Sequence, residues 1–433
     1  MKMRKMFAGF AAAAIALSLM TMSVGAEGTN EPSASANNYS GTITGAKTTT
    51  FDKFLVMKKD ANVPNVEFGF NIAPGSSAAG SAGKLSVREG VGTPTISEGT
   101  NSGKAVFAVT DDTVNEESKE TADNVVFATA TGDDEKYAKH TLTVDFSQVT
   151  FPEPGVYRYI ITEQANATNA VHGITNDSEP ARTLDVYVQD NDGALNIAGY
   201  IMYSGEVTEA PKKTATTPAA TPNGAEAGTK SNSYTNKYST NNLTVGKKVT
   251  GNQASKDKYF KFTVAITNAV AGTVYDVDLT HAFAGDIPAD VNDATTGKTD
   301  AAGNPTEITV GNDGSATAVF WLQSGQYVTI QGLAQTTDYS VTEADYSEEG
   351  YTATAASSTD NDTQFSISDV NFDDDTTGTI DDADLATGFT NTRSGTIPTG
   401  VFLSVAGPAI IGIAAAGGLV FFTMKRKKED AED

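Results

Sequence analysis

The sequence predicts an all-β protein, and two observations indicate this class. Gly, Thr, Asn and Asp are abundant, and no long segment repeats apolar residues at the spacing of a helix. Short runs instead alternate apolar and polar residues with a period of two, which is typical of strands that bury one face. The chain is long enough for two or three domains that each have a core of their own.

Composition excludes several functions. The net charge of −24 argues against nucleic acid as a partner, and the absence of Cys excludes disulfides. The three histidines, His140, His172 and His281, offer little for metal or nucleophilic catalysis. We therefore expect no cofactor and no metal site, and a hydrolase is disfavoured. The run Asp190–Gly193 lacks the later ligands of a calcium loop and predicts a β-turn.

Both ends of the chain carry targeting patterns. Basic residues precede an apolar run at 6–20 and small residues follow it, so residues 1–26 are predicted to be a cleaved signal peptide. Residues 27–40 are small and polar and are expected to be disordered. Residues 401–424 are uncharged and a basic cluster follows them, which predicts a transmembrane helix with a cytoplasmic basic end. A helix of this length, roughly 36 Å at about 1.5 Å per residue, crosses a bilayer core of about 30 Å.

Directly before this span stand Ile397, Pro398, Thr399 and Gly400. Pro-Thr-Gly followed by an apolar span and basic residues resembles the sorting signal that sortases of Gram-positive bacteria read, although the usual signal has one residue between Pro and Thr. The resemblance implies cleavage between Thr399 and Gly400 and transfer of the Thr399 carbonyl to an amine. We assign residues 394–433 to this signal, its membrane span and its basic tail. An ordinary single-span anchor is the alternative.

The first domain is expected to span residues 41–240. Its alternating runs begin near positions 50, 66, 142 and 157, and the first run places Phe51 and Lys53 on one face. The Pro-, Ala- and Thr-rich stretch 206–230 has the composition of a linker between domains. Because Tyr234–Tyr238 has the pattern of one further strand, we interpret this stretch as a long loop inside the first domain.

The second domain is expected to span residues 241–393 and to repeat three polar positions of the first. Each domain has a Lys in its first strand, a Glu in a Tyr-containing strand and an Asn in its last strand. These positions are Lys53, Glu163 and Asn236 in the first domain and Lys247, Glu343 and Asn391 in the second.

All six side chains fall on the apolar face of their strands, because residues two apart in a strand share a face. An unpaired buried Lys or Glu is costly and tends to lose its charge instead. A neutral amine is a nucleophile, and a protonated Glu can polarise a neighbouring carboxamide and shuttle the proton as ammonia leaves. The pattern predicts one Lys–Asn isopeptide bond in each domain, formed once and without turnover. A buried Lys–Glu ion pair beside the Asn is the alternative.

With these motifs the chain resembles the isopeptide-linkage domains of Gram-positive major pilins. The resemblance covers most of the chain between the signal peptide and the sorting signal. It implies two immunoglobulin-like β-sandwiches in tandem, each with a self-catalysed crosslink between its Lys and its Asn that its Glu assists. Lys58 and Lys59 are rivals for the role of Lys53, but they lie at a predicted turn, away from the apolar face.

The same resemblance implies a function as the shaft subunit of a surface pilus used in adhesion. The precursor would be tethered in the membrane, and a sortase would then join identical subunits head to tail, with minor or tip pilins and cell-wall peptidoglycan as further partners. The lysine that receives Thr399 of the next subunit is expected near the last strand of the first domain, where Lys230, Lys212 and Lys213 are candidates. The host ligand is not indicated. A wall-anchored adhesin or stalk protein that does not polymerise is the alternative.

Overall fold

The structure is a computed structural model that describes residues 43–120, 123, 125, 127, 134–164, 172–211, 230–282, 304–356 and 364–396. The predicted signal peptide, the segment 27–40 and the predicted membrane span lie outside these ranges. Within these ranges, no helix has the length and apolar character needed to cross a membrane. The one helical element there is a single 3₁₀ turn, η1 (Ser347–Glu349).

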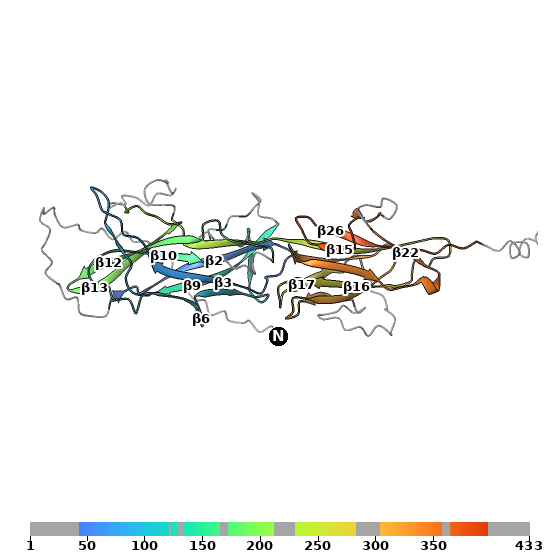
Figure 1. Ribbon diagram of the computed structural model, residues 1–433, viewed down its shortest axis with the longest axis horizontal. Helices are drawn as coiled ribbons and strands as arrows, with labels where there is room; N and C mark the ends of the chain where they lie inside the picture. Colours follow the sequence, from blue (N-terminus) through green and yellow to red (C-terminus); the bar gives the residue numbers. More distant parts are fainter. Residues whose placement is uncertain are drawn as a thin grey trace, which may run out of the picture.

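The all-β prediction is confirmed, and the strands form two β-sandwiches placed end to end along the long axis of the molecule (Figure 1). The first sandwich holds the strands up to Tyr238, and the second holds those from Thr240 onward. Each sandwich has its own hydrophobic core, because the inward residues of its two sheets pack against each other.

The first sandwich consists of two seven-stranded sheets. One has the order β1 (Thr44–Gly45), β13 (Ala194–Ser204), β12 (Ala181–Asn191), β10 (Gly155–Glu163), β3 (Val66–Pro74) and β7 (Lys104–Phe107), with β4 (Val87–Glu89) beside β10. The other has the order β11 (Ile174–Thr175), β14 (Ser233–Tyr238), β2 (Thr48–Lys58), β9 (Glu135–Asp145), β5 (Thr95–Glu98) and β6 (Asn101–Ser102), with β8 (Thr113–Asn115) beside β9.

The second sandwich pairs a six-stranded sheet with a four-stranded one. The larger sheet has the order β18 (Glu307–Thr309), β17 (Val274–Asp278), β20 (Tyr327–Ala334), β15 (Thr240–Thr250), β26 (Leu385–Thr392) and β22 (Thr352–Ala355). The smaller has the order β19 (Ala316–Leu322), β16 (Phe260–Thr267), β21 (Asp338–Glu343) and β25 (Thr377–Thr379), and β23 (Phe365–Ile367) forms a separate hairpin with β24 (Val370–Phe372).

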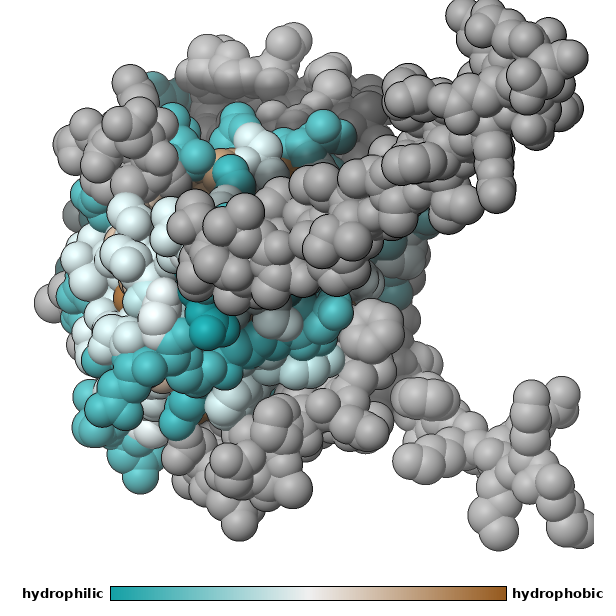
Figure 2. Space-filling view, turned by 90° about the vertical axis from the view of Figure 1, so that its right-hand side faces the viewer, coloured by the Kyte–Doolittle hydropathy of each residue, from teal (hydrophilic) through white to brown (hydrophobic). Residues whose placement is uncertain are grey.

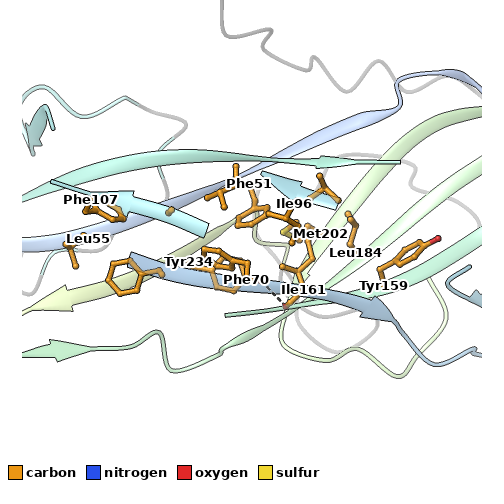
Figure 3. Close-up of a cluster of buried hydrophobic side chains, with 14 of the residues drawn as sticks. Phe51, Leu55, Phe70, Ile96, Phe107, Tyr159, Ile161, Leu184, Met202 and Tyr234 are labelled. Atoms are coloured by element: carbon orange, nitrogen blue, oxygen red, sulfur yellow. Dashed lines mark hydrogen bonds between the residues drawn. The ribbon is translucent and has the colours of Figure 1, made fainter. Parts of the chain in front are cut away.

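Aromatic side chains at alternate strand positions fill the centre of the first core (Figure 3). The rings of Phe51, Phe70 and Tyr234 pack edge to face, with centroids 5.0 to 5.4 Å apart. The Tyr234 hydroxyl donates a hydrogen bond of 2.9 Å to the carbonyl oxygen of Ile161, which joins the two sheets (Figure 3). This packing positions β14 over the inner face of β10.

In both sandwiches the first long strand pairs in parallel with the last. β2 pairs with β14, so the Pro-, Ala- and Thr-rich stretch before β14 connects two strands of one sandwich. β15 pairs with β26 in the same way. A parallel pair requires a long connection between its strands, and here most of each sandwich forms that connection.

The two sandwiches are joined without a linker, because only Ser239 separates β14 from β15. Hydrogen bonds between the turn after β2 and the second sandwich reinforce the junction. Asn62 donates to the carbonyl of Val274 at 3.1 Å, and Asn242 donates to the Asp60 carboxylate at 2.8 Å. Lateral contacts therefore support the junction around the continuous chain.

Two smaller features agree with the sequence patterns. The run Asp190–Gly193 forms the hairpin turn between β12 and β13, with positive φ at Asp192 and Gly193, so the predicted β-turn is confirmed. The described surface at the second-sandwich end is mainly hydrophilic or neutral (Figure 2). Val109 is the one large hydrophobic side chain exposed among the described residues. A surface with few exposed apolar side chains is consistent with the net charge of −24, because most charged side chains lie on the surface.

The β23–β24 hairpin covers the outer face of β15 and β26 next to the second Lys. Phe365 and Phe372 stack with ring centroids 4.8 Å apart, and both rings are buried. A Cβ atom on Gly246 would lie 2.3 Å from the nearest atom of the Phe372 ring. Glycine at this position therefore allows the hairpin to lie directly on the sheet.

We expect Gly246→Ala to destabilise the second sandwich by about 1–3 kcal/mol, because the buried Phe372 ring has to move to admit the methyl group. Gly199→Ala is the matched control, since a Cβ there meets no atom within 4 Å. Urea unfolding measures both variants. A transition of Gly246→Ala at the wild-type urea concentration would show that the hairpin does not pack tightly on the strand.

Candidate crosslinking sites

The first site lies where β2 and β14 run side by side in parallel. Lys53 is the register partner of Tyr234, and Asn236 lies two residues further along β14. Two residues along a strand return to the same face, so the Lys53 and Asn236 side chains both point into the core. Glu163 ends β10 in the opposite sheet and lies across the core from both.

The second site repeats this arrangement element by element. Lys247 on β15 is the register partner of Phe389 on β26, and Asn391 again lies two residues further along. Glu343 ends β21 in the opposite sheet. The stagger between Lys and Asn is therefore identical in the two sandwiches, and the Glu comes from the facing sheet each time.

In the first site the three side chains form one hydrogen-bonded group. Lys53 Nζ donates to both carboxylate oxygens of Glu163, at 2.9 and 3.0 Å. The Nδ2 atom of Asn236 donates to Oε1 of the same carboxylate at 2.6 Å. The side chains of Lys53 and Glu163 are 0% and 3% exposed, and Asn236 is fully buried. The Glu thus bridges an amine and a carboxamide that are both shielded from solvent.

In the second site the ion pair is shorter and similarly buried. Lys247 Nζ lies 2.6 Å from Glu343 Oε1, and the two side chains are 0% and 2% exposed. The Asn391 carboxamide is fully buried, and among the described residues it makes no hydrogen bond of good geometry. Burial raises the pKa of Glu343, and the nearby Lys247 ammonium and, to a smaller extent, the Asn391 carboxamide oppose this rise.

Aromatic rings surround each lysine in equivalent places. Lys53 Nζ lies 4.5 Å from the centre of the Phe68 ring, and Lys247 Nζ lies 4.3 Å from that of Phe260. Phe70 and Phe262, two residues further along the same strands, are the register partners of the two glutamates. The rings shield the amine from solvent while their faces attract the ammonium group, so each Lys is held in place beside its Glu.

Burial moves the ionisation of these groups toward their neutral forms. Burial lowers the pKa of Lys53 to about 8, although the Glu163 carboxylate opposes this shift. Burial also lowers the pKa of Lys247 to about 8, against the same kind of opposition from Glu343. The pKa of Glu343 is raised above its usual value, again chiefly by burial. Proton transfer from Lys247 to Glu343 therefore costs less than it would in water.

Two alternatives for the first lysine are placed elsewhere. Lys58 is the last residue of β2, is 42% exposed at its side chain and donates to Asn241 Oδ1 at 2.6 Å. Lys59 is exposed in the following turn. Neither reaches the core, so Lys53 is the lysine that the structure brings to Glu163 and Asn236.

The residues expected to act in assembly are only partly described. Lys230 is exposed and lies three residues before β14, where its backbone forms an isolated antiparallel β-bridge with Tyr203. Lys212, Lys213 and the sorting signal Ile397–Gly400 lie outside the described residues.

Sequence reasoning missed the loop between β11 and β12, which closes over the first site. The backbone N–H of Asp177 donates to Oδ1 of Asn236 at 2.8 Å. The polarised oxygen of the carboxamide therefore points to this N–H, and the amide nitrogen points to Glu163. The run Asn176-Asp177-Ser178 predicts a turn but carries no signal of what the turn contacts.

Comparison with known families supports the class of protein that these sites suggest. Residues 90–239 match the family model described as a Spy0128-like isopeptide containing domain. Residues 241–393 match a model described as a domain of unknown function. The expected resemblance to pilins of Gram-positive bacteria is confirmed.

Individual relatives lie in the same class. The chain is 27% identical over 387 residues to a protein named pilin from Streptococcus pyogenes serotype M1, a match that covers 89% of this chain and 92% of that protein. A crystal structure of the major pilin from S. pyogenes matches with a TM-score of 0.46 and 22% identity, covering 82% of this chain and all of the other. The T3.2 major pilin of the same organism matches with a TM-score of 0.42 and 19% identity, over 80% of this chain and all of the other.

We expect formation of the second crosslink to have a bell-shaped pH profile. Below the raised pKa of Glu343 the Lys–Glu pair holds two protons, so the amine is charged and cannot attack. Above the Lys247 pKa of about 8 the pair has lost both protons, so no acid remains for the leaving ammonia. A Lys53→Ala chain purified unfolded and refolded at a series of pH values isolates this bond, and intact mass follows it.

Fluorescence of Trp321 during the same refolding separates the rate of folding from the rate of bond formation. A bond-forming rate that keeps rising through pH values well above 8 would contradict the profile, and would mean that Glu343 acts only as a base.

Proposed function

We propose that the chain is the repeating shaft subunit of a covalent pilus on the surface of a Gram-positive bacterium. A sortase cleaves the precursor after Thr399 and joins subunits head to tail, and each sandwich is locked by a Lys–Asn bond that it makes itself. Minor or tip pilins and cell-wall peptidoglycan complete the assembly. The two domains correspond to residues 41–240 and 241–393, and each bond forms once, without turnover.

The observation that carries this proposal is the duplicated geometry of the two sites. A buried Lys–Glu pair is weak evidence for stability, because desolvation offsets most of the attraction. Two such pairs with the same two-residue stagger to an Asn, on the same first and last strands, fit a reaction better than chance burial. The relationship to proteins named pilin supports the same function.

The reaction follows from the contacts in the first site. Lys53 passes a proton to Glu163, and the neutral Nζ then attacks Cγ of Asn236, forming a C–N bond. Glu163 delivers the proton to Nδ2, to which it is already hydrogen-bonded, and the C–Nδ2 bond breaks to release ammonia. Nζ, which still carries two hydrogens, gives the second one back to the Glu163 carboxylate. An amine and a primary amide become a secondary amide and ammonia. Closing a loop of this length stabilises the fold by about 5 kcal/mol in the chain-entropy description.

The placement of the bonds suits a subunit under tension. If the growing polymer is attached at Lys230 and at Thr399, load enters β14 and continues through Ser239 into β15. It then crosses from Lys247 to Asn391 and leaves along the end of β26. On this route the second bond carries the load, so strand β26 cannot be peeled from the sheet. The first bond locks β2 onto the strand through which the load enters.

The intact mass of the secreted part, Glu27 to Thr399, tests both crosslinks. We expect a wild-type mass that is low by two ammonias, with Glu163→Ala and Glu343→Ala each regaining one, because each variant lacks its proton shuttle. Glu348→Ala is the matched control, since this Glu is exposed and lies outside both sites. A wild-type mass without any shift would contradict the isopeptide proposal, and the two sites would then be buried ion pairs only.

Polymerisation is tested in a Gram-positive host that carries the matching sortase. We expect Lys230→Arg to abolish the ladder of covalent oligomers on denaturing gels, because arginine keeps the charge but is not a nucleophile. Lys212→Arg and Lys213→Arg are the controls and should leave the ladder unchanged. A ladder that persists in Lys230→Arg moves the attachment point to another lysine. No ladder in the wild type would favour a wall-anchored adhesin or stalk protein.

A further inference from the structure

The loop between β11 and β12 is bonded to the first crosslinking site at three points. The Asp177 N–H donates to Asn236 Oδ1 at 2.8 Å, as described above. The Asn176 Oδ1 atom accepts a bond of 3.2 Å from Asn236 Nδ2. The Asp177 carboxylate accepts a bond of 2.9 Å from the backbone N–H of Thr235, the residue before Asn236. The loop and the reacting carboxamide are therefore fixed relative to each other.

The Asp177 side chain organises this loop. Its Oδ1 atom accepts the backbone N–H of Glu179 at 2.9 Å, which closes a local turn. Its Oδ2 atom accepts the Thr235 N–H and a bond of 2.8 Å from Arg182 Nη2. Because both carboxylate oxygens are bonded to neighbouring groups, the direction of the Asp177 N–H is set by its own side chain.

Arg182 supports the same loop from β12. It is 4% exposed, and its guanidinium donates twice to the carbonyl of Ser233, at 3.0 and 2.7 Å. The guanidinium also lies 4.4 Å from the centre of the Tyr234 ring. Arg182 therefore joins β12, the loop and β14, and it holds Asp177 against the strand that carries Asn236.

The second site differs at the same point. Among the described residues, neither the oxygen nor the nitrogen of the Asn391 carboxamide has a hydrogen-bond partner of good geometry. The outer neighbour of β26 is the strand β22, whose Ala353 is the register partner of Asn391. In the first sandwich the outer neighbour of β14 is the short strand β11, and the chain beyond it turns back over Asn236.

We propose that the backbone N–H of Asp177 is an oxyanion donor for the first crosslink, and that the Asp177 side chain and Arg182 are its positioning residues. This inference rests on the proposed crosslinking function. As Lys53 Nζ bonds to Cγ of Asn236, the electron pair of the C=O bond moves to Oδ1, where the N–H already lies at hydrogen-bond distance. When that pair returns, the C–Nδ2 bond breaks and ammonia leaves with the proton from Glu163. The first crosslink thus forms with a backbone N–H at the carboxamide oxygen, whereas the described residues offer no such donor to Asn391 in the second site.

The test measures both bonds in the same refolding chain. Full-length protein is purified unfolded and refolded, samples are quenched over time, and the crosslinked peptides of each sandwich are quantified by mass spectrometry. We expect Asp177→Ala to slow the first bond by about ten- to a hundredfold, because the N–H remains but loses its fixed direction. The second bond should keep its wild-type rate and so acts as an internal clock.

Two further variants separate positioning from a general role in folding. Asp177→Asn keeps one of the two acceptor oxygens of the loop and loses the charge that binds Arg182, so we expect an intermediate rate. Arg182→Lys should also slow only the first bond, because it loses the forked donor pair. Asp190→Ala is the control, since Asp190 accepts a backbone N–H in a turn at the far end of β12. Near-ultraviolet circular dichroism in a Glu163→Ala background checks that each variant folds.

The outcomes distinguish failure of the proposed crosslinking function from failure of the oxyanion role of Asp177. If the wild type forms no bond, the proposed function fails. If the wild type forms both bonds and folded Asp177→Ala forms the first at the wild-type rate, the oxyanion role alone is overturned. Equal slowing of both bonds also overturns it, because that is an effect on folding. If Asp177→Ala does not fold, the first-bond rates of Asp177→Asn and Arg182→Lys decide in the same way.

Discussion

The parallel pairing of the first and last strands in each sandwich is the constraint on which both sites depend. With Lys53 opposite Tyr234, the two-residue step to Asn236 places amine and carboxamide on one face, under a Glu from the other sheet. A shift of one residue would turn one of them to the outer face. Because the paired strands are distant in sequence, this register exists only after most of the sandwich has folded. The site is therefore assembled late and inside a finished core.

The same constraint places charged groups where they are costly. Lys53 and Lys247 are fully buried among aromatic rings, and each has a carboxylate as its ionic partner. The attraction within such a pair repays only part of the desolvation. Conversion of the Lys to an amide removes its charge from the core. The proposed reaction therefore removes the desolvation cost of burying that charge. On this proposal the structure with free side chains is the precursor, and the bond that forms in it stabilises it.

The direct passage of β14 into β15 connects the two candidate crosslinking sites. Since one residue separates these strands, Asn236 and Lys247 lie on what is nearly one continuous extended strand. Hydrogen bonds from Asn62 and Asn242 hold the neighbouring turns against this junction. The two candidate sites are therefore joined by one nearly uninterrupted run of strand, and the rest of each sandwich shields its Lys and Asn from solvent. The hairpin on Gly246 does this on the outer face of the second sheet.

The sequence alone was enough for the all-β class, for the strands that carry the six polar residues and for the side of the strand on which each of these residues lies. Period-two alternation shows which face of a strand each side chain occupies, and the order Lys, Glu, Asn recurs in both halves. Alternation does not show which strand lies beside another. The parallel register, the hairpin on Gly246 and the Asp177 N–H at Asn236 were therefore decided by tertiary structure. Each depends on contacts between segments distant in the chain, and a backbone donor leaves no mark in the pattern of side chains.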